Sequence, residues 1–306
     1  MANPSVVEVT PARFDSVGAL VARIADEARA VGGHPVLGDA VWLDLEHPRA
    51  DSAGFLVGED AYAHVARADN DAAREWTLGL AVAPGSPSGD ARRALVAAAA
   101  EHVRRLGGGR MTLWVLGAQS ADDTALRGAG MQPVRDLYEM RVGLPLTEAP
   151  RWPPGVQVRA FEPTRDDAAF LAVNNRAFAG HAEQGGWTET TLARRIAEPW
   201  FDPTLFLLAF DADGMAGFNW LKVHEPHDRD PRMGEIYVVG VDPRAQGTGL
   251  GRALAVGGLG AVHERGIDTG LLFCAADNAP ALALYRSLGF EVHRTDRAYE
   301  CEVQPS

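Results

Sequence analysis

The sequence predicts two tandem α/β domains, each with a mixed β-sheet and helices, and three observations support this prediction. The chain has 306 residues, more than one compact domain usually holds. Residues 144–155 read LPLTEAPRWPPG, and their four prolines and one glycine suit an extended connection better than a helix or strand. The same order of strand, turn and helix signals occurs on both sides of this stretch. We therefore expect a domain at 1–145, a linker at 146–155 and a second domain at 156–306.

The repeat shows as landmarks at a constant spacing. In each half a β-rich run, Trp76–Val82 or Glu235–Val241, is followed closely by a proline. Three pairs of landmarks are each 159 positions apart: Pro84 with Pro243, Arg93-Ala94-Leu95 with Arg252-Ala253-Leu254, and Gly130 with Gly289. These agreements indicate that the two halves are copies of one unit.

Each copy has the same elements in the same order. The order is a strand, a Gly- or Pro-rich turn, a helix, an apolar strand, a helix that ends at a glycine, and a last strand near the end of the domain. The apolar strands are expected at Leu113–Leu116 and Leu271–Cys274, and the first helix of the second copy begins near Leu250. Strands alternating with helices predict an α/β layout with a mixed sheet.

Composition excludes several classes of function. The net charge of −12 opposes binding to nucleic acid or to an anionic membrane. The two cysteines, Cys274 and Cys301, are too few for a disulfide framework and match no metal-ligand spacing. The first residues show no signal peptide, and no apolar run is long enough to cross a membrane. We expect a cytoplasmic protein with no nucleic-acid or membrane partner.

A glycine-rich loop follows the second β-rich run. Residues 244–251 read RAQGTGLG, and such glycines let successive amides converge on a phosphate at a helix N-terminus. Arg244 and Arg252 flank the loop, and each is placed to neutralise one phosphate. The spacing fits neither the dinucleotide pattern GxGxxG nor a P-loop, since Arg252 and Leu254 stand where glycines would be needed.

Two motifs resemble the GNAT acetyltransferases. Gln-x-x-Gly-x-Gly at 246–251 is similar to the family's pyrophosphate loop, and residues 278–290 match Asn-x-x-Ala-x-x-x-Tyr-x-x-x-Gly-Phe. The resemblance implies two tandem GNAT domains, each a mixed, mostly antiparallel sheet flanked by helices, that use acetyl-CoA and no metal. The residues it implies for acetyl-CoA in the second domain are Val239, Gly240, Val241, Gln246, Gly247, Thr248, Gly249, Leu250, Gly251, Arg252, Asn278, Ala279, Pro280, Ala281, Leu282 and Ala283.

Acetyl transfer to an amine needs a base for the amine proton and an acid for the departing thiolate. Glu235 begins the strand before the loop and is the predicted general base; the alternative is a solvated carboxylate or an ion pair with Arg232. Tyr285 occupies the position that in GNAT enzymes faces the coenzyme A sulfur, which implies a general acid. The alternative is a tyrosine packed for its ring. A backbone amide at or near Val239 is expected to polarise the thioester carbonyl.

The first copy lacks these groups. At the corresponding positions it has Trp76 in place of Glu235 and Leu126 in place of Tyr285, and its loop at 85–90 lacks the glycine spacing. We expect a catalytically silent domain that stabilises its neighbour, shapes the cleft, or binds coenzyme A weakly through Leu80, Ala81 and Val82.

A longer likeness points to the acceptor. Residues 174–188, 200–203, 222–224 and 235–238 resemble the mycothiol synthases, a family of tandem GNAT enzymes that acetylate the cysteinyl amine of cysteinyl-glucosaminyl-inositol. The resemblance implies that Glu183 and Lys222 hold the sugar–inositol part, that Glu235 faces the amine, and that Asp39 closes the pocket. Phe273 stands where the family can have a tyrosine. Without the family, Glu183 and Lys222 are more often structural, and His181 and His224 read as ordinary polar residues.

Other functions remain open at this point. A GNAT enzyme for another small amine or a peptide N-terminus fits the same motifs, and a non-catalytic acetyl-CoA sensor would need neither Glu235 nor Tyr285. A cysteine acyl-enzyme through Cys274 is not expected, because that residue lies in an apolar strand with no group nearby in sequence to lower its pKa. We expect a monomer, because tandem copies generally bury their shared face internally.

Overall fold

The computed structural model describes residues 4–32, 35–68, 74–85, 88–180, 184–227 and 230–306. The chain divides into two compact units. Unit 1 comprises Met1–Tyr138, Ala275–Asp277 and Arg294–Ser306, and unit 2 comprises Glu139–Cys274 and Asn278–His293.

Unit 1 contains a sheet in which β1, β2, β3, β4, β5 and β12 are successive neighbours. Only the β4–β5 pair is parallel among the described pairings of this unit. The strands and helices that begin in this unit are β1 (Val6–Val9), α1 (Phe14–Gly32), α2 (Asp39–Glu46), β2 (Ala53–Val57), β3 (Ala61–Arg67), β4 (Glu75–Val82), α3 (Ser88–Arg105), β5 (Gly109–Val115), α4 (Ser120–Gly128) and β6 (Gln132–Gly143), with a 3₁₀ turn at Pro11–Arg13.

Two apolar clusters form the core of unit 1. One joins the sheet to α3 and α4 and includes the fully buried Trp76 and Leu95. The other joins the sheet to α1 and α2 and includes Phe14 and Ile24. Because successive strand residues face opposite sides, the mainly apolar strands β2 and β3 supply both clusters.

Unit 2 repeats this order. Its sheet runs β6, β11, β10, β9, β8, β7, and only β10–β11 is parallel among its described pairings. Its elements are β7 (Gln157–Ala160), α5 (Asp167–Ala177), α6 (Glu189–Ile196), β8 (Phe206–Asp211), β9 (Gly214–His224), β10 (Met233–Val241), α7 (Leu250–His263), β11 (Thr269–Ala275), α8 (Ala279–Ser287) and β12 (Glu291–Val303), with 3₁₀ turns at Pro203–Leu205 and Pro243–Ala245.

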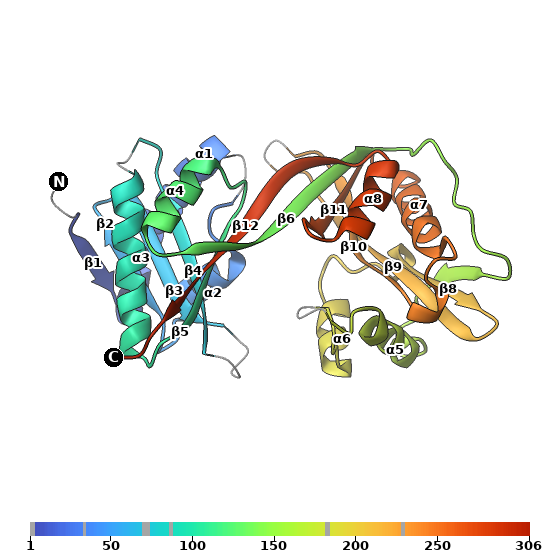
Figure 1. The fold of residues 1–306 in the computed structure, drawn as a ribbon, viewed down its shortest axis with the longest axis horizontal. Coiled ribbons are helices and arrows are strands. Elements are labelled where there is room, and N and C mark those ends of the chain that lie inside the picture. The colour runs from blue at the N-terminus through green and yellow to red at the C-terminus, as the bar shows by residue number, and fades with distance from the viewer. Residues whose placement is uncertain (1–3, 33–34, 69–73, 86–87, 181–183, 228–229) are drawn as a thin grey trace. The chain divides into compact units, whose positions relative to one another are not determined.

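The helices of unit 2 cover both faces of its sheet (Figure 1). Aromatic rings fill the side of α5 and α6, where Phe206 stacks on Trp220 with ring centroids 4.5 Å apart. On the α7 side the contacts are closer. The Val262 side chain of α7 packs on Gly234, and the Asn219 side chain of β9 packs on Gly258, so that one side chain instead of two fills the space at each point. The predicted α/β fold class, with a mixed and mostly antiparallel sheet in each domain, is confirmed.

The division differs from the sequence-based boundaries at the end of the chain. Those boundaries place Arg294–Ser306 in the second domain, whereas these residues belong to unit 1. The reason is strand pairing, because Arg297–Val303 of β12 runs antiparallel to Val115–Gly109 of β5. Similarly, residues 139–143 of β6 belong to unit 2.

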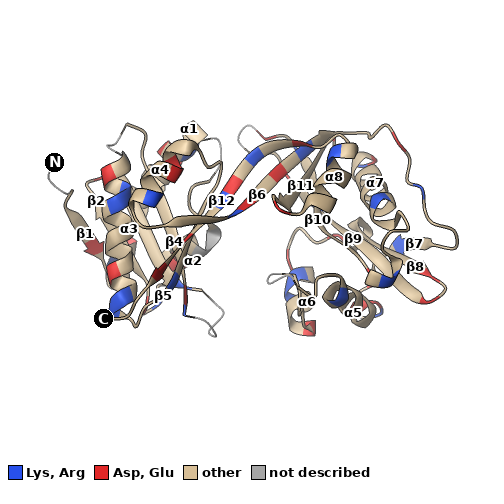
Figure 2. Cartoon of the chain, in the orientation of Figure 1, with Lys and Arg blue, Asp and Glu red and all other residues tan. Residues whose placement is uncertain are grey.

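The proline-rich stretch 146–155 has no helix or strand, as expected. It is packed onto unit 2, since the Trp152 ring lies against Gly257 of α7 and Glu148 binds Arg252. Acidic and basic residues are interspersed along helices such as α3 and α6 (Figure 2). Among the described helices, none combines the length and the apolar character that a membrane span requires.

Candidate active site

The centre of the site is an opening between two strands of unit 2. β10 and β11 run parallel from Gly234↔Gly270 to Ile236↔Leu272, and their pairing ends there. On its other side β10 stays paired with β9 as far as Val241, through a register shift between Ile236 and Val238. The segment Val238–Val241 therefore has one edge turned away from β9 and towards the opening, where an extended ligand can add hydrogen bonds to the strand.

The glycine loop follows β10 directly. Gly247 and Gly249 have φ values of +78° and +88°, a backbone conformation that side-chain-bearing residues rarely adopt. Gly249 precedes the first residue of α7, and the Thr248 hydroxyl donates to the Ala245 carbonyl at 2.7 Å. The first amides of α7 have no partner four residues earlier. The loop and helix together offer converging N–H donors and a positive dipole end to an anion.

Asp242 anchors the start of this loop. It is buried and accepts hydrogen bonds from the Arg244 amide at 3.1 Å and from Arg176 Nε at 2.9 Å. Burial by itself raises the pKa of Asp242, but these bonds outweigh it and hold the pKa below its usual range. The ionised carboxylate fixes the turn from which the loop departs.

The two flanking arginines are engaged elsewhere. Arg244 Nη1 donates to Asp211 at 2.7 Å, and Arg252 binds Glu148 and donates to Ser287 at 2.7 Å. Arg244 and Arg252 are 35% and 39% exposed, and the pairing of each with a phosphate stays a prediction. The backbone amides of the loop are further donors at the same place.

Glu235 lies on β10 at the edge of the opening. Its side chain is 9% exposed, and its Oε2 is 2.6 Å from Nε2 of His224, which is 31% exposed. Arg232, the partner considered from sequence, binds Glu225 instead at 3.1 Å. The β9–β10 register brings His224 to the acid, a contact that the sequence did not predict.

Lys222 stands opposite Glu235 in the antiparallel pair, so both side chains share one face of the sheet. Its ammonium lies 4.8 Å from the ring centroid of Trp200 and 5.9 Å from that of Tyr237. Arg195 of α6 donates to the Tyr237 hydroxyl. Burial raises the pKa of Tyr237, which keeps its hydroxyl protonated.

Trp200 and Tyr237 were not predicted as site residues. Each looks like a core aromatic in the sequence, and each does pack against Trp220. The only available signal was their place within the segments that resemble the mycothiol synthases.

Tyr285 lies on α8, on the β11 side of the opening. Its ring is buried against Phe290, with centroids 5.7 Å apart. Burial, and secondarily the neighbouring Cys274, raises the pKa of the phenol. Within the part of the chain that the structure describes, its hydroxyl has no hydrogen-bond partner. Asn278 caps the same helix, because its Oδ1 accepts from the Ala281 amide at 3.2 Å.

The other predicted substrate residues differ in placement. Phe273 is 39% exposed on β11. It lies two residues beyond Leu271, the residue that pairs with Glu235, and therefore projects from the same face of the sheet as Glu235. Asp39 is the first residue of α2 in unit 1, but its side chain lies outside the described part of the structure. Glu183 and His181 also lie outside the described residues.

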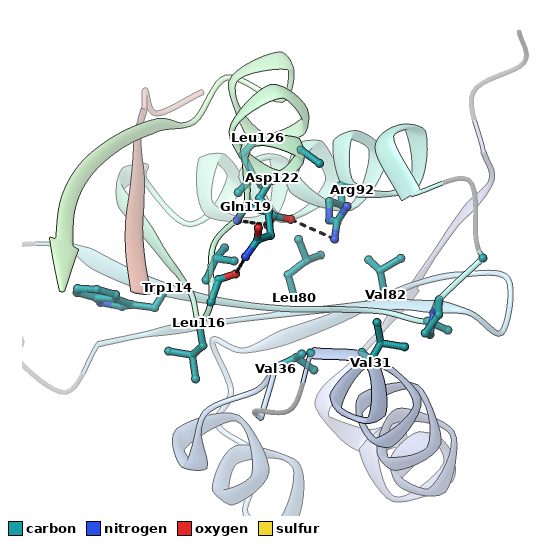
Figure 3. Close-up of a pocket in the computed structure, with 18 residues that line it drawn as sticks. Val31, Val36, Leu80, Val82, Arg92, Trp114, Leu116, Gln119, Asp122 and Leu126 are labelled. Carbon is teal, nitrogen blue, oxygen red and sulfur yellow. Dashed lines mark hydrogen bonds and ion pairs between the residues drawn. The ribbon is translucent and has the colours of Figure 1, made fainter. Parts of the chain in front are cut away.

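Unit 1 has the same opening without the same chemistry. The parallel pairing of β4 and β5 ends at Leu78↔Leu113, and a cavity of about 380 Å³ follows. Its walls are largely apolar, and they include Leu80, Val82 and Leu126 (Figure 3).

The polar side chains of this cavity bind one another. Arg92 lies 3.3 Å from Asp122, which in turn accepts from the Gln119 amide at 2.9 Å. Trp76, at the place of Glu235, is buried and donates its indole N–H to Gly108. No acid–base pair corresponds to Glu235 and Tyr285 at these positions.

The described residues include no group of three or more His, Cys, Asp or Glu side chains arranged to hold a metal ion. The site consists of backbone amides, one buried acid with a histidine, one buried phenol and a lysine beside two aromatic rings.

Comparison with known proteins adds the family. The profile described as the Acetyltransferase (GNAT) family matches residues 168–290. A mycothiol acetyltransferase of Kocuria rhizophila is 38% identical over 308 residues, covering 96% of this chain and 99% of that protein. The chain belongs to the mycothiol acetyltransferase family. It is accordingly an acyltransferase, and another family member, from Streptomyces coelicolor, is 38% identical over 98% of this chain and 95% of its own length.

Solved structures agree on the fold of the family. A GCN5-related N-acetyltransferase from Sphaerobacter thermophilus aligns with a TM-score of 0.74 and 21% identity over 98% of this chain and 96% of that one. A tandem GNAT protein from the clavulanic acid biosynthesis pathway aligns with a TM-score of 0.69 and 19% identity over 99% of both chains. GNAT acetyltransferases use acetyl-CoA, and the fold of this chain matches along almost the whole length of both structures.

Proposed function

We propose that this enzyme transfers the acetyl group of acetyl-CoA to the cysteinyl amine of cysteinyl-glucosaminyl-inositol and so produces mycothiol. The observation that carries the proposal is the buried Glu235 at the point where β10 and β11 separate. The relatives named mycothiol acetyltransferase, similar over almost the whole chain, support the choice of acceptor.

Glu235 acts as the general base. The acceptor amine must lose a proton as it attacks the thioester, and a carboxylate at the edge of the opening is placed to take it. Its Oε2 already bonds to His224, which leaves Oε1 to face the amine, directly or through one water.

Tyr285 acts as the general acid. A phenol is protonated at neutral pH, so Tyr285 has a proton to give to the departing thiolate. Burial raises its pKa and so holds this proton until the thiolate develops beside it. Tyr285 lies near Cys274, which is two residues beyond Leu272, the last β11 residue that pairs with β10. Tyr285 is therefore on the opposite side of the opening from β10.

The backbone of unit 2 fits the rest of acetyl-CoA. Val239–Val241 offers its unpaired edge to the pantetheine arm, and an amide near Val239 is available to polarise the thioester oxygen. The amides of residues 246–251 suit the pyrophosphate. Asn278 and Ala279–Ala283 open the helix that flanks the thiol end; since Asn278 caps this helix, its contribution is to fix the helix start.

Lys222, Trp200 and Tyr237 form the acceptor side. Flat aromatic rings around a cation suit a hydroxyl-rich ring compound, which can stack its C–H face on an aromatic and accept hydrogen bonds from the ammonium. Phe273 adds apolar surface on the same face of the sheet. Asp39 and Glu183 complete the proposed acceptor set.

Unit 1 is proposed to lack turnover of its own. Leu80, Ala81 and Val82 run along an opening that can receive a pantetheine-like arm, but the acid and base positions hold Leu126 and Trp76.

The test is an assay of the full chain with acetyl-CoA and a panel of amines that includes cysteinyl-glucosaminyl-inositol, an aminoglycoside and a peptide with a free N-terminus. Thiol release and product mass are measured for each. We expect a strong preference for cysteinyl-glucosaminyl-inositol. Turnover with another amine alone would retain acetyl transfer and reject the acceptor.

A further inference from the structure

The bond between His224 and Glu235 has a consequence for proton transfer. The two atoms, Nε2 and Oε2, are 2.6 Å apart, and the histidine is about three times as exposed as the acid, at 31% against 9%. His224 is near the end of β9 and diagonal to Glu235 across the antiparallel pair, two positions from Lys222. The second ring nitrogen of His224, Nδ1, has no hydrogen-bond partner among the described residues, so it is available to solvent.

A buried general base must lose the proton it has accepted after every turnover. If Glu235 accepts the amine proton, it becomes a neutral carboxylic acid, and that proton has to reach solvent before the next acceptor binds. The acid itself has little contact with water. A bound acceptor would cover it further, whereas an imidazole exchanges protons readily near neutral pH.

We propose that His224 is a positioning residue that holds Glu235 in place and carries its proton to solvent. This inference rests on the proposed role of Glu235 as the base. In the resting pair the neutral imidazole donates its Nε2–H to the ionised Oε2. Once Glu235 has taken the amine proton at Oε1, exchange of the ring proton with solvent gives the Nδ1–H tautomer, and rotation of the carboxyl group turns its O–H towards the free Nε2. The O–H bond breaks and an N–H bond forms at Nε2, giving carboxylate and imidazolium. The imidazolium then loses its Nδ1 proton to water or buffer, which restores the Nε2–H that donates to the carboxylate. One proton has moved from amine to solvent, and both side chains return to their starting charge.

Other charged and polar groups lie near the pair. Lys222 of β9 is opposite Glu235 in the strand register, and its ammonium lies 4.8 Å from the Trp200 ring centroid. Tyr237 of β10 is near enough to Glu235 for the charge of the acid to contribute to its raised pKa, and Arg195 of α6 donates to the Tyr237 hydroxyl.

The experiment uses two variants of the full-length enzyme. His224→Ala removes both the bond and the proton carrier, and His224→Gln keeps a donor towards Glu235 but cannot carry a proton. His263→Ala is the matched control, because His263 is 35% exposed and lies 3.4 Å from Asp268 in the same unit, at the end of α7. Turnover, KM for acetyl-CoA and rescue by added imidazole are measured for each.

We expect His224→Ala and His224→Gln to lower kcat by about tenfold or more, as loss of a proton-transfer group does, with KM for acetyl-CoA and the His263→Ala control unchanged. Free imidazole should restore His224→Ala in a saturable manner. Near-normal turnover of His224→Gln would overturn the relay, because a hydrogen bond alone would then suffice.

A separate variant distinguishes failure of the relay from failure of the base. If Glu235→Gln is inactive while both His224 variants turn over normally, the relay is wrong and the base stands. If Glu235→Gln turns over normally, the proposed base is wrong, and the relay with it.

Discussion

Each unit contains a buried carboxylate bonded to a histidine, and the two pairs differ in how completely they are bonded. In unit 1, Asp44 bonds to His64 at 2.7 Å and to Arg49 Nε at 2.7 Å, and His64 Nδ1 lies 2.9 Å from the Tyr62 hydroxyl. Both side chains of the pair are 2% exposed. In unit 2, Glu235 bonds only to His224 among the described residues, and the histidine reaches solvent.

The difference fits a structural role for Asp44 and His64 and the proposed proton-transfer role for Glu235 and His224. Asp44 and His64 have a partner for each polar atom that the pair buries, so they stabilise the fold and have no free atom through which to exchange a proton with solvent. Glu235 keeps one oxygen and His224 one nitrogen without such a partner, which is costly for folding but useful for moving a proton. The two sheets are alike, and the two acid–histidine pairs lie at different places in them, Asp44 on α2 and Glu235 on β10.

The largest expected effect is on stability, through the pair of Asp44 and His64. Asp44→Ala should lower the free energy of unfolding by about 3–5 kcal/mol at neutral pH, because it leaves His64 and Arg49 without their buried partner. Urea denaturation of the full chain measures this, with Glu27→Ala, which removes an exposed ion pair on α1, as the control. A loss below about 1 kcal/mol would mean that the network is not structural.

The pair of Asp44 and His64 also predicts that stability depends on pH in the acid range. Burial tends to raise the pKa of Asp44, but hydrogen bonds from His64, Ser52 and Arg49 lower it to about 2. Because this pKa lies below that of the unfolded chain, the contribution to stability is complete above about pH 4 and is lost as pH falls towards 2. Wild type should lose stability across this range more steeply than Asp44→Ala. Equal slopes would contradict the assignment.

The next effect is on turnover, through Glu235. Glu235→Gln should reduce turnover by roughly a hundredfold or more, while binding of acetyl-CoA to the protein, measured by calorimetry, is retained. Glu225→Gln is the control, since that carboxylate lies nearby, is exposed and pairs with Arg232. Unchanged turnover of Glu235→Gln would remove the functional contrast between the two pairs.

A smaller effect is expected at Tyr285. Tyr285→Phe should slow the acetyl-transfer step by about tenfold to a hundredfold, because water replaces a positioned acid less effectively. Tyr299→Phe provides the comparison from unit 1, where a buried phenol donates to Asp123 at 2.6 Å. It should change stability but not turnover. A wild-type rate for Tyr285→Phe would assign the proton to water.

The smallest effect concerns the glycine loop. Gly249→Ala forces a side chain into a left-handed backbone, at a cost of about 1–2 kcal/mol, and should raise KM for acetyl-CoA about fivefold to tenfold. Gly58→Ala carries the same kind of strain at an exposed turn of unit 1, where φ is +57°. Its KM should match wild type. Equal KM values for both variants would argue against the loop as the pyrophosphate site.

The sequence by itself determined the repeat, the elements and the loop. Their signals are local: Pro84 and Pro243 close matching strands, Gly130 and Gly289 follow matching helices with φ values of +88° and +91°, and the loop glycines precede α7. Glu235 was singled out by its place at the start of the strand before the loop, and Tyr285 by the second GNAT motif. Each of these features depends on residues that are close together in the chain.

Only the tertiary structure decided which distant groups meet. His224 reaches Glu235 through the register of β9 on β10, and a slip of one residue would turn its side chain to the other face. Lys222 lies beside Trp200 and Tyr237, which come from other parts of the chain. β12 joins unit 1 by pairing with β5, almost 200 positions earlier in the chain. Local preference cannot specify such pairings, because their energy comes from burial and hydrogen bonds between segments that are far apart in the sequence.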